Sequence, residues 1–445
     1  MEGAHDHVLR IVEDRAVRVV QLWFTDVLGI SRSFDITPGE LERALAEGIT
    51  FDGSAIDGFS RVQESDVLAK PDPKTFQLVA WRPDSEPPVA RVACDILNLD
   101  GTLFEGSPRN VLRRTLERAQ ELGFSFYAAP EVEYFYLTSG DTGPALEPLD
   151  HGSYFELTVA DKAANLRKAT VLTLEDMGIP VEYSQHEDAP GQHEIDLRHA
   201  DALSMADTVM TVRHVAKELA QERGAHATFM PKPFAAVQGS GMHTHFSLFE
   251  GNRNAFHDPG DPHNLSAVAR GFIAGLLAHA REITAVTNQW VNSYKRLVAG
   301  YEAPVFVAWA RNNRSVVVNV PHVKKGRPDS TRIEYRAPDS VCNPYLAFAV
   351  ILAAGLKGVE HSYKLPAELP VNLYQLTPEE LLTEGIVALP GSLGEAIYEA
   401  ERSELVAATL GEHVFEWFIR NKKEEWRDYI AQVTQWEVAK YLPML

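Results

Sequence analysis

Ionisable and apolar side chains alternate in steps of two along several short segments of this 445-residue chain. In PEVEYFYL, residues 130–137, the acids Glu131 and Glu133 alternate with Val132 and Tyr134. Successive side chains of a β-strand point to opposite faces, so the acids share one face and the apolar residues share the other. The pattern predicts a strand with one buried face and one face that carries carboxylates.

Three further segments have the same alternation. VEYSQHEDAPGQHEIDLR (181–198) predicts a hairpin, because the turn sequence DAPG separates two alternating runs. GMHTHFSLF (241–249) and TRIEYRAPD (331–339) predict single strands. The polar groups that these segments contribute are Glu187 and Glu194, then His243, His245 and Ser247, and then Arg332, Glu334 and Arg336.

These polar faces suggest a metal site. A single E-x-E or H-x-H pair most often belongs to a solvated or hydrogen-bonded sheet face. Several such faces bring carboxylates together, and divalent cations relieve the repulsion between them. Oxygen ligands with one imidazole suit Mg²⁺ or Mn²⁺ better than Zn²⁺. We expect two or three such ions, which usually bridge the phosphates of a nucleotide, here ATP.

The composition argues against several kinds of partner. The chain has 42 basic and 62 acidic residues, a formal charge of −20, which repels nucleic acids and anionic membranes. Its most apolar run, Tyr345 to Leu356, is shorter than the roughly 20 residues that span a bilayer, and predicts a buried helix. The two cysteines, Cys94 and Cys342, are far apart, and the N-terminus carries no export signal. We therefore expect a cytoplasmic protein without disulfides.

The order of the predicted elements suggests two domains, residues 1–102 and 103–445. The first mixes short β-rich runs with one helix, which Thr37-Pro38 begins and Gly48 ends. The second alternates strands with helices, which predicts a mixed or antiparallel sheet. Its longer helices are expected at 161–178, 207–223, 264–287, 392–409 and 411–433.

Phosphate binding must rely on other groups than a glycine cradle, because no P-loop sequence occurs. Arg296 and Arg314 carry guanidinium groups, which bind carboxylate and phosphate oxygens. The non-periodic stretch 297–304 contains Gly300 and Glu302. It fits either an ordinary glycine loop or a lid over a site.

Nine motifs in one order resemble those of type I bacterial glutamine synthetases, and the resemblance covers essentially the whole chain. They are FDGSAIDGF (51–59), RVQESD (61–66), PEVEYF (130–135), HEDAPGQHEID (186–196), MPKPF (230–234), GSGMHTH (239–245), NSYKRLVAGYEAP (292–304), NRS (313–315) and RIEYRAPD (332–339).

The resemblance implies an α+β protein with a small N-terminal β-grasp domain and a large C-terminal catalytic domain of antiparallel sheet with surrounding helices. It also implies a dodecamer of two stacked hexameric rings, with active sites between adjacent subunits. The implied activity is the ATP-dependent ligation of ammonia to the γ-carboxylate of L-glutamate.

The same resemblance implies roles for individual residues. The metal ligands would be Glu131, Glu133, Glu187, Glu194, His243 and Glu334. The residues at ATP would be Glu182, His245, Ser247, Arg314 and Arg332. Those at glutamate would be Gly239, His243, Arg296, Glu302 and Arg336. The ammonium pocket would hold Tyr154, Glu187, Glu302 and, from the neighbouring subunit, Asp52. The expected catalytic residues are Asp52, Tyr154, Glu302 and Arg314.

These residue types fit the implied chemistry. A carboxylate is a poor electrophile, so ATP is expected to convert glutamate into γ-glutamyl phosphate before the amine attacks. Ammonium must first lose a proton, and Asp52 and Glu302 are the candidate acceptors. Closure of a flap at 297–304 would keep water from the acyl phosphate. Asp52 and Asp66 both match the family and favour ammonia.

Four residues depart from the family pattern. Ala55 stands where a second serine is usual, Gln238 replaces an asparagine, Ala299 replaces a proline, and Asn319 replaces an arginine that faces the phosphates. Loss of one charged phosphate contact reduces transition-state stabilisation by roughly 2–4 kcal/mol. Ala55 therefore motivates one alternative, a γ-glutamyl ligase for a larger amine such as a polyamine or ethanolamine. Asn319 motivates another, a catalytically weak sensor or scaffold.

Two positions bear on regulation. Arg61 lies where the shorter, feedback-inhibited members carry an arginine, and the chain length agrees with that branch. Tyr374 aligns with the adenylylated tyrosine of the longer branch, but its flanking residues differ. We expect the chain to belong to the feedback-inhibited branch and not to be adenylylated.

Overall fold

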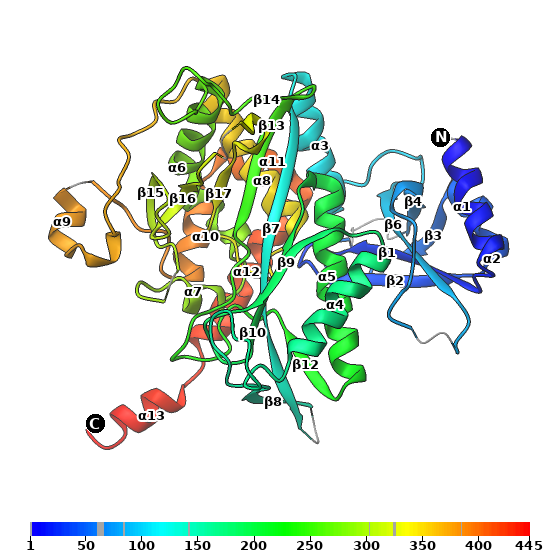
Figure 1. Ribbon diagram of the computed structural model, residues 1–445, viewed down its shortest axis with the longest axis horizontal. Coiled ribbons are helices and arrows are strands. Elements are labelled where there is room, and N and C mark those ends of the chain that lie inside the picture. Colours follow the sequence, from blue (N-terminus) through cyan, green and yellow to red (C-terminus); the bar gives the residue numbers. More distant parts are fainter. Residues whose placement is uncertain are drawn as a thin grey trace.

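Two β-sheets with separate main cores build the protein (Figure 1). The computed structural model describes residues 2–59, 66–82, 85–140, 143–301, 303–323, 326–383 and 385–445. Within these ranges, no helix combines the length and the apolar character that crossing a bilayer requires. Cys94 and Cys342 are both buried and free.

The first sheet has the strand order β2-β1-β6-β4-β3, with β5 paired to β6. Its elements are α1 (Glu2–Asp14), β1 (Val19–Thr25), β2 (Ser31–Ile36), α2 (Pro38–Glu47), β3 (Ile49–Asp52), β4 (Asp66–Pro71), η1 (Pro73–Thr75), β5 (Gln77–Leu78) and β6 (Val89–Leu97). Leu22 and Phe24 of β1 pack with Leu41 and Leu45 of α2, whereas Trp23 belongs to the larger core. Because successive side chains of β1 point to opposite faces, this strand contributes to both cores.

The second sheet has the strand order β15-β16-β17-β13-β7-β10-β9, and β8, β11 and β12 also pair with β7. Its strands are β7 (Ser125–Gly140), β8 (Gly143–Pro148), β9 (Val181–His186), β10 (Gln192–Leu197), β11 (Ala200–Asp201), β12 (Ala225–Thr228), β13 (Thr244–Glu250), β14 (Arg253–Asn254), β15 (Phe306–Arg311), β16 (Val316–Val320) and β17 (Ile333–Tyr335). β15 and β16 run parallel, whereas β7 pairs antiparallel with β10 and β13. The predicted mixed or antiparallel sheet is confirmed as a mixed one, in which the described pairings other than β15–β16 are antiparallel.

Helices cover the apolar face of this sheet. The helices that follow β6 in the chain are α3 (Pro108–Glu121), α4 (Ala164–Asp176), α5 (Ala202–Glu222), α6 (Ala267–Thr287), α7 (Ser293–Arg296), α8 (Pro344–Glu360), α9 (Pro378–Thr383), α10 (Leu393–Glu401), α11 (Glu404–Leu410), α12 (Glu412–Ile430) and α13 (Gln435–Tyr441), with short turns η2 (Pro328–Ser330) and η3 (Leu373–Gln375). Val132 and Tyr134 of β7 and Phe246 and Leu248 of β13 point into the larger core. The polar positions between them consequently face the other way.

The buried helix predicted from the apolar run 345–356 is confirmed as α8. Its start is well defined, because Pro344 occupies the first turn and the Asn343 side chain accepts hydrogen bonds from the N–H groups of Tyr345 and Leu346. α8 packs closely on α6: a Cβ added at Gly358 would lie 2.1 Å from the carbonyl oxygen of Gly271. Glycine is required here by the backbone contact and not by its own conformation.

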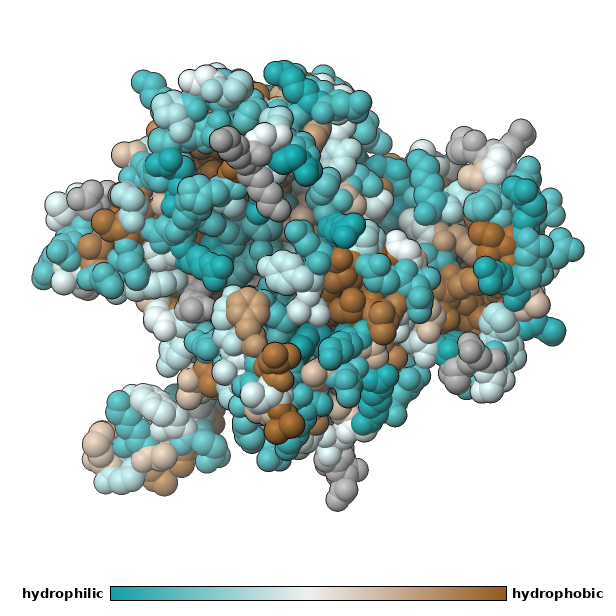
Figure 2. Space-filling model, viewed as in Figure 1, coloured by the Kyte–Doolittle hydropathy of each residue, from teal (hydrophilic) through white to brown (hydrophobic). Residues whose placement is uncertain are grey.

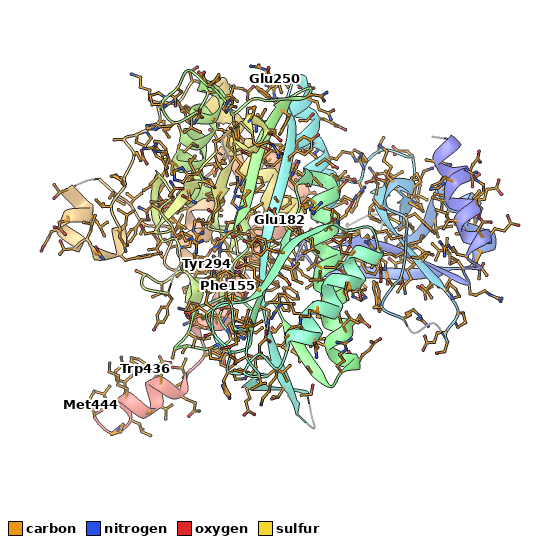
Figure 3. All side chains as sticks on the ribbon, viewed as in Figure 1. Phe155, Glu182, Glu250, Tyr294, Trp436 and Met444 are labelled. Atoms are coloured by element: carbon orange, nitrogen blue, oxygen red, sulfur yellow. The ribbon has the colours of Figure 1, made fainter. Side chains whose placement is uncertain are left out.

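The C-terminal helix α13 stands away from the rest of the molecule (Figures 1 and 2). Trp436, Leu442, Met444 and Leu445 are all exposed on this segment, and Figure 3 labels Trp436 and Met444 there. No other described element of the chain encloses these apolar side chains.

Two helix predictions need correction. The helix predicted at 392–409 is two helices, α10 and α11, because the hydroxyl of Ser403 accepts a hydrogen bond from the N–H of Val406 and starts a new helix. The other is α1, whose Val8 and Val12 pack in the first core and which was not predicted. The shorter α2 is marked by Thr37-Pro38 at its start and Gly48 at its end, whereas no such signals mark the ends of α1.

The close packing of α6 and α8 gives a testable expectation. Gly358→Ala should lower the melting temperature, because the added methyl group meets backbone that cannot move aside, a cost of about 1–3 kcal/mol. Helix propensity alone would change stability the other way, by up to about 1 kcal/mol in favour of alanine. Gly39→Ala in α2 is the matched control, since nothing lies within 4 Å of its added Cβ. A Gly358→Ala protein that melts at or above the wild-type temperature would contradict this packing.

Candidate active site

The strand register aligns acidic side chains in rows across the second sheet. β7 and β10 pair Glu133 with Glu194 and Glu131 with Asp196. β10 and β9 pair Glu194 with Gln185. Residues directly opposite on antiparallel strands share a face and approach to about 5 Å between Cβ atoms. Two rows of acids therefore lie together on the face turned away from the larger core.

A further row approaches from the other half of the sheet. His245 of β13 lies opposite Glu334 of β17, and Glu334 lies opposite Asn319 of β16. His245 is also opposite Ala129 of β7, two residues from Glu131 and hence on the same face. Six strands thus contribute polar side chains to one surface.

Two neighbouring cavities open over these rows. The larger, about 390 Å³ and here called the acidic cavity, is lined by Glu131, Glu133, Glu187, Glu194, His243 and Glu334, together with Tyr154, Arg314 and Arg336. The adjoining cavity, about 300 Å³, is lined by Glu182 and Ser247. Glu131, Tyr183, His245 and Arg332 line both. Figure 3 marks Glu182 near the centre of the molecule.

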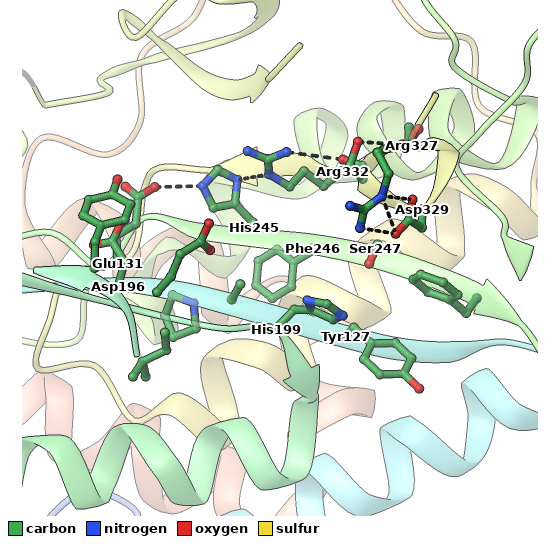
Figure 4. A pocket seen from close by; sticks show the side chains of 18 residues that line it. Tyr127, Glu131, Asp196, His199, His245, Phe246, Ser247, Arg327, Asp329 and Arg332 are labelled. Carbon is green, nitrogen blue, oxygen red and sulfur yellow. Dashed lines mark hydrogen bonds and ion pairs between the residues drawn. The ribbon is translucent and has the colours of Figure 1, made fainter. Parts of the chain in front are cut away.

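A chain of hydrogen bonds crosses the junction of the two cavities (Figure 4). The Nε of Arg332 lies 3.3 Å from Nδ1 of His245, and Nε2 of His245 lies 2.8 Å from Oε1 of Glu131. The other oxygen of Glu131 lies 3.4 Å from Nδ1 of His243, which is also 3.7 Å from Glu133. Arg332 donates to His245, which in turn donates to Glu131, so one tautomer satisfies both contacts.

Positive or hydrogen-bonding neighbours stabilise some of these acids as carboxylates. Burial opposes ionisation of Glu131, but hydrogen bonds from His243 and His245 outweigh it and hold its pKa well below the ordinary value. Burial likewise opposes ionisation of Glu334, but the charge of Arg336 prevails and lowers its pKa. Both carboxylates are therefore charged.

For Glu133 and Glu194 such neighbours do not outweigh the effect of burial. Burial, followed by the charge of Glu187, raises the pKa of Glu133 to about 8. Burial and the neighbouring Asp196 raise the pKa of Glu194 well above its ordinary value, and Asp196 itself is raised to about 6, chiefly by burial. A cation in the cavity would supply the missing positive charge.

The donor set fits a hard divalent cation. Glu131, His243 and Glu334 each offer a ligand atom, and these atoms lie within 4.8 Å of one another. Burial and the charge of Arg336 lower the pKa of His243 to about 4, so its imidazole is neutral, the form that binds metals. Oxygen-rich donors with one imidazole match Mg²⁺ or Mn²⁺.

Comparisons with known proteins agree along nearly the whole chain. Residues 16–99 match the family model "Glutamine synthetase, beta-Grasp domain", and residues 105–441 match "Glutamine synthetase, catalytic domain". The chain belongs to the glutamine synthetase family. The fold of this family is the one observed, a β-grasp unit followed by a large mixed α+β unit, and the chain is an ATP-dependent ligase of the family.

Close sequence relatives carry the same name. The chain is 54% identical over 446 residues to glutamine synthetase of Mycolicibacterium smegmatis and 55% identical to that of Mycobacterium tuberculosis, with 100% of each chain covered. It is 47% identical to the Thermotoga maritima glutamine synthetase, with 98% of both covered. A solved structure named "GmaS/ADP complex-Conformation 1" is similar, with a TM-score of 0.88, 31% identity, and coverage of 98% of this chain and 99% of that one.

Asp52 lies away from both cavities of this chain. Asp52 ends β3 in the first sheet, where it accepts a hydrogen bond from the N–H of Ser54 at 2.8 Å. It does not line either cavity. Glu302 and Arg61 lie outside the described residues.

Arg296 and Gly239 lie beside the acidic cavity but do not line it. The buried guanidinium of Arg296 donates to the carbonyls of Ala337 and Arg336 at 2.8 and 3.2 Å, and lies 3.4 Å from Nε2 of His243. A Cβ at Gly239 would lie 2.9 Å from Cγ of Arg296, so any larger residue at position 239 would collide with the arginine side chain.

Sequence reasoning did not select several residues that line the cavities. Tyr183, Gln185 and Asp196 share faces with Glu187 and Glu194, and the same two-residue alternation identifies them. His199, Arg327 and Asp329 follow no such pattern, because turns place them at the adjoining cavity.

The segment after Arg296 has two described attachments. The hydroxyl of Tyr374 donates to the carbonyl of Ala303 at 2.5 Å. The Nζ of Lys232 lies 4.0 Å from the ring centroid of Tyr301, a cation–π contact. Gly300 has a φ of 96°, which suits glycine.

Charge placement at Asn319 can be tested directly. Its Nδ2 donates to Oε2 of Glu334 at 2.6 Å. Asn319→Asp keeps the shape but sets two carboxylates together, and should destabilise the metal-free protein by about 3 kcal/mol. Thermal unfolding in EDTA and in Mg²⁺ measures this, with partial recovery expected in Mg²⁺. Asn165→Asp on the exposed surface of α4 is the control, and equal melting of both variants in EDTA would refute the expectation.

Proposed function

We propose that this chain ligates ammonia to the γ-carboxylate of L-glutamate at the expense of ATP, through γ-glutamyl phosphate. The observation that carries the proposal is the convergence of five carboxylates and two imidazoles on a single cavity, beside a second cavity, in a chain whose full length matches glutamine synthetases. The relatives do not favour the larger-amine alternative.

Divalent ions, two or three per site and either Mg²⁺ or Mn²⁺, are proposed to bind in the acidic cavity. The proposed ligands are Glu131, Glu133, Glu187, Glu194, His243 and Glu334. Bound ions would neutralise negative charge on the transferred phosphoryl group. The uncompensated burial of Glu133 and Glu194 supports this assignment.

ATP is proposed to occupy the adjoining cavity, with its phosphates directed toward the acidic one. Glu182 and Ser247 line the adjoining cavity alone, and His245 and Arg332 stand at the junction. Arg314 lines the acidic cavity, where a hydrogen bond with Tyr154 outweighs burial and raises its pKa, so its charge is secure beside a phosphoryl group. The similar solved structure is named as an ADP complex.

Glutamate is proposed to bind at the far end of the acidic cavity, held by Gly239, His243, Arg296, Glu302 and Arg336. Arg336 lines this cavity and contacts Glu334 through its guanidinium. Its remaining N–H groups suit a carboxylate of the substrate. Arg296 donates a hydrogen bond to the main-chain carbonyl of Arg336 and thereby helps to position that residue.

Ammonium is proposed to bind near Tyr154 and Glu187, with Glu302 and Asp52 completing the pocket. Because Asp52 lies in the first sheet of this chain, we propose that a neighbouring subunit of a dodecamer supplies it. Asp52 and Glu302 would accept the proton that ammonium loses before it attacks the acyl phosphate. The segment 297–304 would act as the flap that excludes water.

Further proposals concern the context of the enzyme. We place the domain boundary at residue 102, which falls between the two ranges that match family models. We assign the chain to the shorter, feedback-inhibited branch, without adenylylation at Tyr374, and to the cytoplasm. The burial and lack of pairing of both cysteines support a reducing compartment.

An amine panel tests the proposed reaction. With glutamate, ATP and Mg²⁺, phosphate release should depend on ammonia, and ethanolamine or a polyamine should give less than about a tenth of that rate, since a small cation site rejects bulk. The same panel in Mn²⁺ identifies the preferred ion. Release with a larger amine alone would establish the first alternative. Intact ATP binding without release for any amine would establish the sensor or scaffold instead.

Metal binding tests the proposed ligands separately from turnover. Glu131→Gln should weaken Mn²⁺ binding, followed by electron paramagnetic resonance, by at least about tenfold. Glu182→Gln loses the same charge from the adjoining cavity alone and is the control. Equal Mn²⁺ affinity in the two variants would exclude Glu131 as a ligand.

A further inference from the structure

A second cluster of ionisable groups lies behind the β9–β10 hairpin. It contains Asp150, Asp161, His186 and His193, whose ligand-type atoms lie within 4.8 Å of one another, and all four are buried. The guanidinium of Arg167 in α4 forms an ion pair with Asp161 of this cluster. None of these five residues lines the acidic or the adjoining cavity.

The contacts in this cluster determine which ring nitrogens of its two histidines carry protons. Arg167 lies 2.6 Å from Nδ1 of His193 and can only donate, so Nε2 of His193 carries the proton and faces Asp150 at 3.4 Å. His186 has Asp150 Oδ1 at 2.8 Å from Nε2 and the carbonyl of Glu187 at 2.6 Å from Nδ1. Both of these neighbours only accept, so His186 donates from both nitrogens and is positively charged.

This pattern argues against a metal in the cluster. His186 is protonated on both nitrogens, and His193 accepts from Arg167 at 2.6 Å, a much shorter contact than the 3.4 Å between Arg296 and His243. Two cations, Arg167 and His186, balance two anions, Asp150 and Asp161, and Arg167 pairs with Asp161 at 3.0 Å. Asp150 Oδ2 and both oxygens of Asp161 are buried without a hydrogen bond, but the charges of the cluster balance among its own residues. The hydrogen bonds of the other Asp150 oxygen show what the cluster holds.

Asp150 ties together two segments that reach the acidic cavity. Besides His186, its Oδ1 accepts hydrogen bonds from the N–H groups of Gly152 at 3.2 Å and Gly191 at 2.9 Å. The first belongs to the loop that carries Tyr154, and the second to the turn that follows Glu187. One buried oxygen thus anchors both segments.

His186 completes the connection. Its ring is bonded to the carbonyl of Glu187, and its own carbonyl accepts from the N–H of Phe155 at 3.1 Å. The loop passes so close that a Cβ at Gly152 would lie 2.5 Å from Nε2 of His186. Tyr154 and Glu187, which both line the acidic cavity, are therefore fixed relative to each other through groups outside it.

We propose that Asp150 and His186 are positioning residues that fix the spacing of Tyr154 and Glu187, and through this spacing the fit of the ammonium ion. This inference rests on the proposed function, which places ammonium beside these two side chains. The contacts act on Glu187 through its main chain, so a shift of the hairpin moves its carboxylate relative to the rest of the cavity.

Two variants test this proposal in the full-length enzyme. Gly152→Ala pushes the loop away from His186, and Asp150→Asn keeps an acceptor oxygen but loses the charge that pairs with His186. At saturating metal, each should raise the KM for ammonium about tenfold while the KM values for ATP and glutamate stay within about twofold, and each should weaken Mn²⁺ binding about tenfold because Glu187 is displaced.

His279→Gln is the matched control, because His279 forms another buried contact with a carboxylate, 2.9 Å from Glu282 in α6, away from both cavities. It should leave the ammonium KM and the Mn²⁺ affinity unchanged. Folded Gly152→Ala or Asp150→Asn protein with wild-type values of both would overturn the proposal. So would a loss confined to kcat that the control shares. If the wild type fails to use ammonia, the proposed function fails, and the Mn²⁺ measurement still decides whether the spacing is controlled in this way.

Discussion

Repulsion among buried carboxylates is the constraint on which this site depends. The register of β7 against β10 brings Glu131 beside Asp196 and Glu133 beside Glu194. A shift of one residue would turn these acids into the apolar core, so the hydrophobic alternation holds them in place against their own repulsion. The imidazoles of His243 and His245 stabilise the charge of Glu131, whereas burial prevails at Glu133 and Glu194 and raises their pKa values. A bound cation would offset the excess of negative charge in the acidic cavity.

The surrounding structure keeps this surface rigid. The close contact of α6 with α8 and the buried face of β7 form one continuous core beneath the cavities. Behind the hairpin, the charge-balanced cluster around Asp150 holds the loop of Tyr154 against the turn after Glu187. In the described part of the segment near Ala303, the carbonyl of Ala303 accepts from Tyr374 and the ring of Tyr301 contacts Lys232. A rigid floor that holds the reacting groups in place is what a water-excluding reaction requires.

Local pattern predicted the site residues that lie on strands. The two-residue period grouped Glu131 with Glu133 and His243 with His245, and applied more fully it also identifies Asp196 and Tyr183. It failed where turns set direction, as for His199 and Asp329, because turn residues carry no periodicity. It also failed for helices whose limits depend on a single cap, such as Ser403 between α10 and α11.

The sequence by itself determined which side chains face together within each strand, where α8 is buried, and to which family the chain belongs, because these follow from short-range alternation, apolar content and motif order. Only the tertiary structure decided that β7 lies between β10 and β13, that Arg296 lies beneath the cavity, and that Asp150 joins two segments of the site. Strand order and buried hydrogen bonds arise from contacts between residues far apart in the chain. No local pattern encodes them, since their energy exists only once the whole sheet has formed.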